Sequence, residues 1–463
     1  MNAVTLVLPK DLADQLSAAA AQRTESAAVL IAGTAREGQR LRLLGRELHW
    51  VADRYYAQRT STGLDIASGG YVPALRRAEE LGAVAVWVHT HPGGDPSPSR
   101  RDAGVDAALA PLFTVRTGQD LYASVVISPA DTDEASTVRF TGTALDGAGE
   151  PRRIERLWIV GPRFRAVTAA DTTDPPVDEV FDRQVRALGP ALQAQLARLR
   201  IGLVGAGGTG SAVGEQLARL GVGHLLVVDP DDLSASNLTR VHGAGVADVG
   251  RPKAEIVAGH AAAIGLGTKV EPVVGSVVQE GVAARLRDCD LVFGCTDDHA
   301  GRMVLSRLST YYLLPVIDCG VLVSSNAGVL SGIDARVSVL APGYSCLLCR
   351  DRVDPQQAAL EQMDPGERGR RAAEGYAPEL PGVEPAVVAY TTLVAALAVN
   401  EMLERLVGYG VAPPPGEILA RIHDRELSTH TRPSRPGHYC ADGAAARGCG
   451  DRTPLLEMTW VSP

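Results

Sequence analysis

Aromatic residues are scarce in this sequence, and it has no long apolar run and no excess of positive charge. Aromatic side chains make up 4% of the 463 residues, so Ala, Val, Leu and Gly must fill most of the interior. No apolar stretch reaches the roughly 18 residues that a membrane-spanning helix needs. The net charge is −9, whereas a protein that binds nucleic acid needs a basic face. We therefore expect no membrane span and no nucleic-acid partner.

A secretory signal is also missing. The opening segment MNAVTLVLPKDLADQ has neither a basic start nor a long apolar run. In a chain without a signal, seven cysteines that include a Cys-x-x-Cys pair predict metal ligands or buried thiols rather than disulfides. These features predict a cytoplasmic protein.

The length and the order of the patterns predict two domains of mixed α/β structure. Residues 1–160 mix short strands and helices, and residues 161–178 are rich in Thr, Asp and Pro, which predicts a linker. Residues 179–463 begin with alternating helix and strand patterns, typical of a parallel α/β sheet. Within this half, the apolar pattern predicts two helices, at residues 184–199 and 386–405.

The run AVAVWVHTH (residues 83–91) predicts a buried strand that ends in two histidines. Alternation along a strand places His89 and His91 on one face, where two imidazoles can bind one Zn²⁺. After a loop rich in Gly and Pro, Ser99 stands at a predicted helix N-cap, with Asp102 in the first turn. The alternative is a capping box, in which both side chains only bind N–H groups of the helix end.

Together, His-x-His, seven residues, Ser, two residues and Asp resemble the JAMM signature of the JAB/MPN metalloproteases, including the proline after the second histidine. The resemblance implies that His89, His91 and Asp102 bind a catalytic Zn²⁺. A water would take the open fourth position, and zinc lowers the pKa of that water toward 7. Ser99 would help to hold the oxyanion. The resemblance further implies an α+β fold, a cytidine-deaminase-like sheet sandwich, for residues 1–160.

The same family needs an upstream glutamate as general base and acid. The segment ESAAVLIAG (residues 25–33) is similar to the family's glutamate, apolar strand and glycine, so Glu25 is the candidate. Glu37 and Glu47 are rivals, but neither leads directly into such a strand. The alternative for Glu25 is a solvated charge at a helix end.

A second motif occupies residues 200–229, RIGLVGAGGTGSAVGEQLARLGVGHLLVVD. Glycines between an apolar strand and a helix allow a tight turn and a close approach of phosphate to the helix N-terminus. Asp229, at the end of the next strand, would bind ribose. On its own this motif also fits a dinucleotide-dependent oxidoreductase. The candidate glycines are Gly205, Gly207, Gly208 and Gly210.

The residues that follow favour ATP over NAD, because they resemble the ThiF, MoeB and ubiquitin-activating adenylyltransferases. The family's Ser-Asn-Leu-x-Arg, Gly-x-Pro-Lys and Cys-Thr-Asp-Asn-x-x-x-Arg stand here as residues 236–240, 250–253 and 295–302. Asp298 replaces the usual asparagine, and we expect slightly altered nucleotide contacts. FDRQ (residues 181–184) matches the Arg-Gln near the start of the family's domain.

This resemblance implies a Rossmann-like domain with a mainly parallel sheet that adenylates a carboxylate with ATP and Mg²⁺. Such a reaction needs positive charge on the phosphates and on the pyrophosphate that leaves. In this family the Arg of Arg-Gln commonly reaches the nucleotide of a partner subunit, which implies a homodimer through this domain. The implied contacts are Arg183, Arg240 and Lys253 with phosphates, Asp297 with Mg²⁺, Asp229 with ribose, Asn237 with a phosphate or the acyl group, and Ser236 and Asp298 beside them.

Four cysteines form a candidate structural zinc site. Cys346 and Cys349 stand in GYSCLLCR, and Cys440 and Cys449 in HYCADGAAARGCGD. Many relatives carry two Cys-x-x-Cys pairs on a structural Zn²⁺, and the eight residues within the second pair here depart from that pattern. Four thiolates are the expected ligands, with His438 as a substitute if one cysteine cannot reach.

The other cysteines have no assigned chemistry. Cys289, Cys295 and Cys319 stand in apolar, strand-like contexts and are predicted to pack in the interior. Thioester-forming relatives place a catalytic cysteine near the segment that is residues 375–390 here, and no cysteine stands there. We therefore assign no catalytic cysteine.

Both resemblances concern the C-terminus of a protein. JAMM enzymes cleave peptide or isopeptide bonds after ubiquitin-like tails, and ThiF-like enzymes adenylate the exposed glycine. The fusion implies processing and activation of one ubiquitin-like or sulfur-carrier protein that ends in Gly-Gly. A bacterial ubiquitin-like conjugation system with a conjugating enzyme, including systems linked to antiviral defence, fits this implication. Thiocarboxylate formation in cofactor or secondary-metabolite biosynthesis fits it too. A non-catalytic MPN scaffold attached to an adenylyltransferase is a third hypothesis, but it would require a broken JAMM motif.

Overall fold

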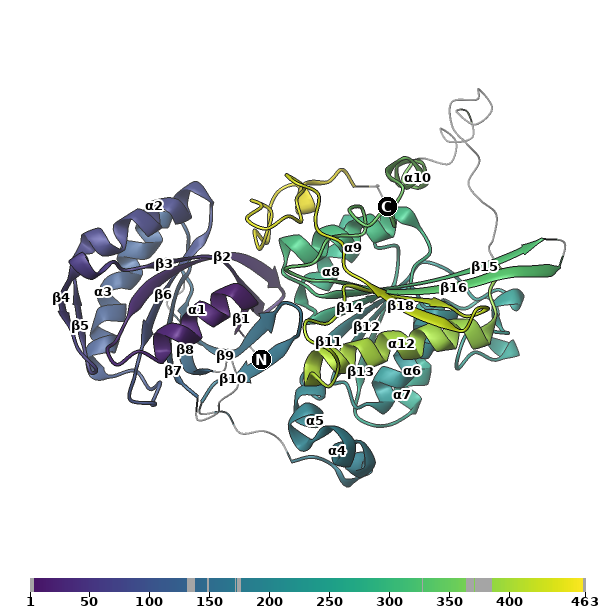
Figure 1. Ribbon diagram of the computed structural model, residues 1–463, viewed down its shortest axis with the longest axis horizontal. Coiled ribbons are helices and arrows are strands. Elements are labelled where there is room, and N and C mark those ends of the chain that lie inside the picture. The colour runs from purple at the N-terminus through teal and green to yellow at the C-terminus, as the bar shows by residue number, and fades with distance from the viewer. Residues whose placement is uncertain are drawn as a thin grey trace. The chain divides into compact units, whose positions relative to one another are not determined.

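The computed structural model describes residues 4–130, 138–147, 150–170, 172, 176–326, 328–363, 370 and 385–460. The chain forms two compact units (Figure 1). The first holds Met1–Asp174 together with Tyr311–Leu313 and Ala445–Arg452, and the second holds the rest. None of the helices in the described ranges is long and apolar enough to cross a membrane.

The first unit is built on one mixed sheet with the strand order β1-β3-β2-β6-β7-β8-β9-β10, in which β1 also pairs with β9. The parallel pairs are β1 with β3, β1 with β9, and β6 with β7. The strands are β1 (Val4–Pro9), β2 (Ala27–Glu37), β3 (Arg40–Trp50), β6 (Val84–Thr90), β7 (Tyr122–Pro129), β8 (Val138–Leu145), β9 (Pro151–Val160) and β10 (Arg165–Thr168). The short strands β4 (Tyr56–Arg59) and β5 (Leu64–Ile66) form a separate hairpin.

Helices cover both faces of this sheet, and strand alternation decides which residues each face receives. Helix α1 (Lys10–Ala20) packs on one face against a core that includes Val86 and Val88 of β6. Helices α2 (Val72–Glu80) and α3 (Arg100–Thr117) pack on the other face, where Trp87 belongs to the core. Because side chains alternate along β6, His89, which follows Trp87 by two positions, also faces α3.

The main segment of this unit ends within the range predicted as a linker. Its last residue is Asp174, inside the predicted linker 161–178. Within that range, β10 pairs antiparallel with β9 from Arg165↔Ile159 to Thr168↔Arg156. The linker prediction was therefore wrong for β10, because a four-residue edge strand leaves little alternation to detect.

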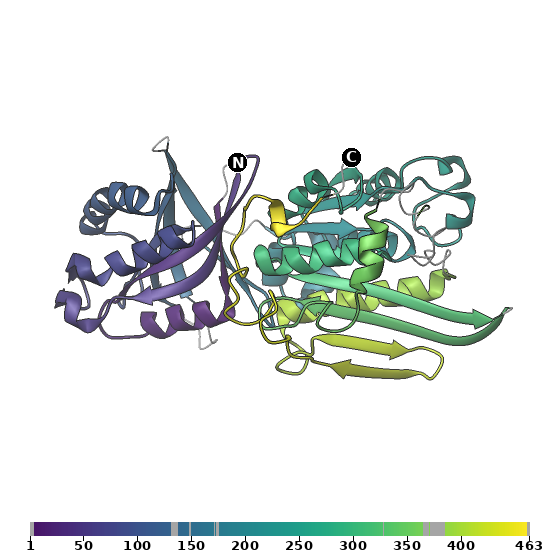
Figure 2. The same ribbon diagram turned by 90° about the horizontal axis from the view of Figure 1, so that it is seen from above.

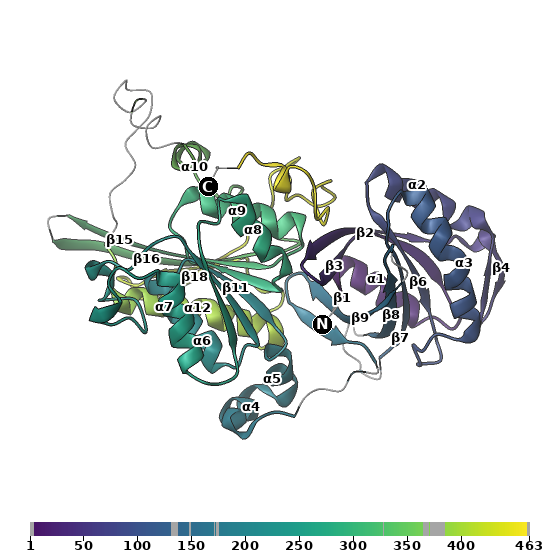
Figure 3. The same cartoon turned by 180° about the vertical axis from the view of Figure 1, so that it is seen from behind.

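The second unit contains a sheet of order β13-β12-β11-β14-β15-β16-β17-β18 (Figure 3). The first five of these strands run parallel, and the last three pair antiparallel. The mainly parallel sheet predicted for this half is confirmed. The strands are β11 (Arg200–Val204), β12 (His224–Asp229), β13 (Lys269–Val274), β14 (Leu291–Gly294), β15 (Val316–Asn326), β16 (Val329–Leu340), β17 (Glu417–Arg421) and β18 (Glu426–His430). Strands β15 and β16 form a long hairpin (Figure 2).

Helices α6 (Gly208–Arg219), α7 (Lys253–Ala263) and α12 (Val388–Val407) lie on one face of this sheet, and α8 (Glu280–Arg285) and α9 (His299–Tyr311) lie on the other (Figures 1 and 3). In the central order β13-β12-β11-β14-β15, the chain adds β12 and β13 on one side of β11 and then β14 and β15 on its other side, so the strand order switches between β11 and β14. In such sheets ligands bind beyond the carboxyl ends of the strands at this switch. The candidate nucleotide residues follow those strand ends.

Two predicted helices of this unit have different outcomes. The predicted helix 386–405 is confirmed as α12. The predicted helix 184–199 is instead α4 (Asp182–Leu188) and α5 (Pro190–Leu196). Gly189 separates them with a φ of 85°, and Pro190 cannot donate the N–H that a continuous helix requires. The single-helix prediction missed this break.

Candidate active sites

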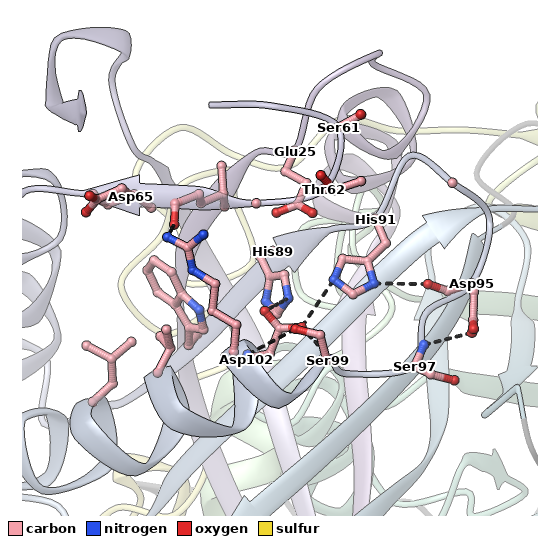
Figure 4. A pocket seen from close by; sticks show the side chains of 18 of the residues that line it. Glu25, Ser61, Thr62, Asp65, His89, His91, Asp95, Ser97, Ser99 and Asp102 are labelled. Atoms are coloured by element: carbon pink, nitrogen blue, oxygen red, sulfur yellow. Dashed lines mark hydrogen bonds and ion pairs between the residues drawn. The ribbon is translucent and has the colours of Figure 1, made fainter. Parts of the chain in front are cut away.

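The first candidate site lies where β6 ends against α3 (Figure 4). His89 follows Trp87 on the α3 face, and His91 is held to β7 by a hydrogen bond from its N–H to the carbonyl of Ile127, 2.8 Å. Asp102 faces both histidines from the first turn of α3. Its Oδ1 lies 3.4 Å from Nε2 of His89, and its Oδ2 lies 3.5 Å from Nε2 of His91. The structure thus brings the three predicted metal ligands together.

The capping box and the ligand cluster coexist at the start of α3. The N–H of Asp102 donates to Oγ of Ser99 at 3.2 Å, and the N–H of Ser99 donates to Oδ2 of Asp102 at 2.6 Å. A carboxylate offers about four lone-pair sites, so this cap leaves acceptor capacity toward both imidazoles. Burial alone would raise the pKa of Asp102, but the contacts with His89 and Ser99 outweigh it and hold the pKa well below its usual range. The cap therefore fixes an ionised carboxylate in front of the histidines.

The donor set fits a metal ion. Nδ1 of His91 lies 3.0 Å from the carbonyl oxygen of Asp95, which can only accept, so in the neutral imidazole the proton is on Nδ1 and the lone pair of Nε2 is available to a metal ion. His89 is 5% exposed, and within the described residues neither of its ring nitrogens has a hydrogen-bond partner. The ligand atoms of the two histidines and Asp102 lie within 4.8 Å of one another. Two imidazoles and one carboxylate suit a catalytic Zn²⁺ site with an open fourth position.

Glu25 lines the same pocket, from the segment that leads into β2. The register pairs Ala27 of β2 with His89, so Glu25 stands just beyond the end of the pairing. Its N–H donates to the carbonyl of Thr60 at 2.7 Å, and its carbonyl accepts from Nε of Arg59 at 2.7 Å. Burial raises the pKa of the Glu25 carboxyl, an effect that the nearby histidines oppose. A buried carboxylate with a raised pKa suits a general base and acid.

The two rival glutamates lie elsewhere. Glu47 forms an ion pair with Arg77, with Oε1 and Nη2 2.7 Å apart, and the hydrogen bonds from Arg77 lower its pKa. Glu37 is the last residue of β2, at the opposite end of the strand from Glu25. Neither Glu37 nor Glu47 is among the residues that line the pocket. Only Glu25, of the three glutamates considered, shares a pocket with the histidines.

The pocket has a volume of 570 Å³ and extends well beyond these residues. Sequence reasoning missed its other walls. Trp87 had a signal, because it precedes His89 by two residues on the same strand face. Leu64 and Ile66 of β5 had none, because only the tertiary fold brings the β4–β5 hairpin to the segment before β2.

The second candidate site begins at the turn between β11 and α6. Gly205 has a φ of 93°, which a side chain would strain. A Cβ at Gly210 would lie 1.8 Å from the carbonyl oxygen of Gly205, so this glycine permits the close turn. Gly207 is the N-cap of α6 and Gly208 is its first residue. The backbone N–H groups at this helix start form the expected surroundings for a phosphate.

Asp229 ends β12 beneath this turn and is 5% exposed. Its Oδ2 accepts from the N–H of Ala206 at 2.6 Å, and its Oδ1 accepts from the N–H of Asp231 at 2.9 Å. Burial raises the pKa of Asp229, and these two hydrogen bonds oppose the rise. The predicted ribose ligand therefore also shapes the glycine-rich turn.

The predicted phosphate-binding cations stand near the turn but are paired locally. Nζ of Lys253 lies 2.8 Å from Oδ2 of Asp231. Nη1 of Arg240 donates to the carbonyl of Ser236 at 3.1 Å, and a Cβ at Gly208 would lie 3.1 Å from Cγ of Arg240. Asn237 uses its side-chain oxygen to accept from the N–H of Ser234 at 3.1 Å.

The loop after β14 brings the two aspartates of CTDD to the same strand ends. A Cβ at Gly205 would lie 2.6 Å from the carbonyl oxygen of Cys295, so the two loops touch. Asp297 is exposed. Asp298 accepts hydrogen bonds from the N–H of Gly301 and the hydroxyl of Thr296, which caps the start of α9. Asparagine caps helices as well as aspartate does, so this departure from the family pattern preserves the cap.

Arg183 lies on α4 and is exposed. Among the described residues its side chain makes no hydrogen bond or ion pair. The segment 375–390, where relatives that form a thioester carry their cysteine, lies largely outside the described residues.

The third candidate site gathers Cys346, Cys349, His438 and Cys440, whose ligand atoms lie within 4.8 Å of one another. Sγ of Cys349 lies 3.7 Å from Sγ of Cys440, and Nδ1 of His438 lies 3.2 Å from Sγ of Cys440. Two thiolates at about 2.3 Å from one tetrahedral Zn²⁺ are about 3.8 Å apart, so the spacing fits zinc.

His438 replaces Cys449 in this cluster. Cys449 is 6% exposed and belongs to the segment Ala445–Arg452 of the first unit, where Gly450 bridges to Thr34. The expected ligand set of four thiolates is therefore corrected to three thiolates and the histidine named as substitute. Cys289 and Cys319 are buried as predicted, whereas Cys295 is only partly buried.

Comparisons with known proteins match both halves of the chain. The model of the ThiF family matches residues 181–437, and a model described as prokaryotic homologs of the JAB domain matches residues 9–141. Together these matches span most of the chain.

Among curated proteins, the chain is similar to the SAMP-activating enzyme E1 of Haloferax volcanii, with 29% identity over 223 residues, 48% of this chain and 76% of that protein. It is also similar to the sulfur carrier protein adenylyltransferase of Thermus thermophilus, with 28% identity, 58% of this chain and 94% of that protein. The molybdopterin-synthase adenylyltransferase of Escherichia coli is 28% identical over 52% of this chain and 86% of that protein. Among solved structures, E. coli MccB with ATP matches 57% of this chain and 75% of that chain, with 15% identity and a TM-score of 0.46.

Proposed function

This chain belongs to the ThiF family and carries a JAB domain before it, and from that premise we propose that it processes and activates the C-terminus of one ubiquitin-like or sulfur-carrier protein. The first unit hydrolyses the peptide or isopeptide bond after Gly-Gly, and the second adenylates the exposed glycine with ATP. The observation that carries the first step is the meeting of Glu25, His89, His91 and Asp102 in one pocket. The second step is supported by the family and by relatives named as adenylyltransferases or activating enzymes.

In the hydrolytic step each residue has a distinct task. His89, His91 and Asp102 would hold Zn²⁺, which when bound lowers the pKa of a water toward 7 and polarises the scissile carbonyl. Glu25 takes a proton from the attacking water and returns it to the leaving amine, for which a raised pKa is suited. The hydroxyl of Ser99 donates to the carbonyl oxygen as negative charge develops there.

In the adenylation step the second unit binds ATP at the carboxyl ends of β11, β12 and β14. The N–H groups at the start of α6 and the side chains of Arg240 and Lys253 bind the phosphates. Asp229 accepts from the ribose hydroxyls, and Asp297 would hold Mg²⁺, which prefers carboxylate oxygen. Asn237 orients a phosphate or the acyl group. The cysteine and histidine cluster would hold a structural Zn²⁺ away from the chemistry.

The biological setting we propose is a bacterial ubiquitin-like conjugation system, in which a thiol attacks the acyl adenylate, AMP leaves, and the carrier passes as a thioester to a conjugating enzyme. Thiocarboxylate formation on a sulfur carrier is the alternative. Both settings need the same two reactions. They differ in what attacks the adenylate, which is a thiol in the first case and a sulfur donor in the second.

The test uses the full chain and a carrier protein whose Gly-Gly is followed by a short tail. Zinc-loaded wild type should release the tail, seen by mass spectrometry, and should then support ATP–pyrophosphate exchange. His91→Ala should abolish release but leave exchange with a carrier that already ends in Gly-Gly. Asp297→Ala should do the reverse. Normal cleavage by His91→Ala would refute the peptidase, and exchange driven by free amino acids would refute the carrier as substrate.

A further inference from the structure

The pocket of the first unit has a second, apolar end (Figure 4). Its volume of 570 Å³ far exceeds what an ion and a water need, since a water occupies about 30 Å³ in the liquid. The polar end holds Glu25, the two histidines and Asp102. The apolar residues that line the pocket are Leu64, Ile66, Tyr71, Trp87, Val105 and Leu109, and the charged residues Asp65 and Arg101 line it too.

The side-chain repeats of β6 and α3 place the apolar lining residues on the same faces as the predicted metal ligands. Trp87 precedes His89 by two residues on one face of β6, which places it about 7 Å along the strand. Val105 and Leu109 follow Asp102 by three and seven residues on α3, so they share its helix face. A substrate that reaches the metal ligands therefore meets apolar surface within about one or two residues' length.

The apolar walls are held in place by packing. The ring of Trp87 packs edge-on against Tyr71 at 6.2 Å and Phe113 at 6.3 Å between centroids. Nη2 of Arg101 donates to the carbonyl of Leu64 at 2.7 Å, which fastens β5 to α3. These contacts fix the positions of the side chains and of the hairpin that line the apolar part of the pocket, which we call the chamber.

Part of this apolar surface is left uncovered. Leu64, Ile66, Tyr71 and Val105 pack against the buried core but are themselves only partly buried. Concave apolar walls beside a few placed polar groups are typical of a ligand subsite. An apolar group that covered them would be stabilised by the hydrophobic effect.

We propose that this chamber binds a large apolar side chain, such as Leu, Met or Phe, of the first residue after the bond that is cleaved. The proposal rests on the peptidase function proposed above. Glycine has no side chain, so the Gly-Gly before the bond cannot fill the chamber. The residue that follows the bond is the nearest one that can, and it belongs to the segment that is released.

The test compares carriers that differ only in the residue after Gly-Gly. For zinc-loaded wild type, kcat/KM should be roughly 10-fold or more higher with Leu than with Ala at that position, as expected for apolar pockets. Asp should be cleaved more slowly than Ala. Val105→Phe fills the chamber and should reduce the value for the Leu tail toward that for the Ala tail. Val115→Phe is the matched control, because Val115 lies on the same helix and is 80% exposed.

The outcomes separate the two proposals. Cleavage by wild type with equal kcat/KM for all tails would overturn the subsite and leave the peptidase standing. A preference that follows the residue before Gly-Gly would also overturn it. Absence of any cleavage by zinc-loaded wild type would overturn the peptidase itself. The wild-type tail series stands without any variant, and ATP–pyrophosphate exchange shows whether each variant is folded.

Discussion

The two candidate active sites differ in how far the chain alone assembles them. In the first unit, side chains from β6, α3 and the segment before β2 already converge on one pocket. In the second unit, the charged candidates are engaged with neighbours: Lys253 with Asp231, Asp298 with its own helix cap, and Asp229 with the glycine-rich turn. The first candidate site is preorganised, whereas the second candidate site would have to exchange local partners for ATP.

Physical chemistry accounts for this difference. In the first site, contacts outside the ligand set orient the ligands, as Asp95 does for His91 and Ser99 for Asp102. A phosphate site relies on backbone N–H groups and on cations that form interim pairs. In the pair between Lys253 and Asp231 the lysine side chain is 12% exposed and the aspartate side chain is 64% exposed, so Asp231 can turn into solvent when a phosphate takes its place beside Lys253. Local pairing is thus compatible with rapid binding of nucleotide.

The largest expected effect tests whether the first site is complete. Glu25→Gln should lower tail cleavage by about 10²–10⁴-fold, because a general acid–base group is lost while the metal ligands remain. Zinc content, measured by elemental analysis, should be unchanged. Glu47→Gln is the control, since Glu47 pairs with Arg77 outside the pocket. Full activity of Glu25→Gln with a dead Glu47→Gln or Glu37→Gln would show that the base was misassigned.

The next effect concerns the structural metal. Cys440→Ala should remove one of the zinc ions that the chain binds and lower its thermal stability, because a structural zinc contributes folding free energy directly. Cys449→Ala should keep every zinc ion, since Cys449 lies outside the ligand cluster. The measurement is the zinc-to-protein ratio together with the unfolding temperature. Zinc loss from Cys449→Ala but not from Cys440→Ala would restore the ligand set of four thiolates.

Site residues that lie close together in the sequence could be predicted, whereas those that only the tertiary fold brings together were missed or named only as substitutes. His89, His91 and Asp102 could be found because the whole pattern that resembles the JAMM signature lies within a short stretch of sequence, where a strand period and a helix cap also fix the directions of the side chains. His438 could be named only as a substitute, because the path of the chain after Cys440 is set by tertiary packing. It carries Cys449 into the first unit, where Gly450 bridges to Thr34. Arg59 was missed for the same reason, since the pairing of its hairpin with the segment around Glu25 joins residues 34 apart.

The smallest expected effect is a partial recovery of activity in mixed dimers, and it tests whether the second site needs another subunit. Arg183 is exposed on α4, and a third side-chain cation beside Lys253, Arg240 and the Mg²⁺ proposed at Asp297 would stabilise the negative charge that develops on the pyrophosphate as it leaves. We propose that the chain forms a homodimer through its ThiF half and that Arg183 reaches the partner's nucleotide. Arg183→Ala and Asp297→Ala should each lack ATP–pyrophosphate exchange. Mixed and allowed to exchange subunits, they should recover roughly a quarter of wild-type activity, because half of randomly formed dimers are mixed and each has one intact site. If subunits exchange and no activity returns, or if light scattering shows a fully active monomer, Arg183 does not act across an interface.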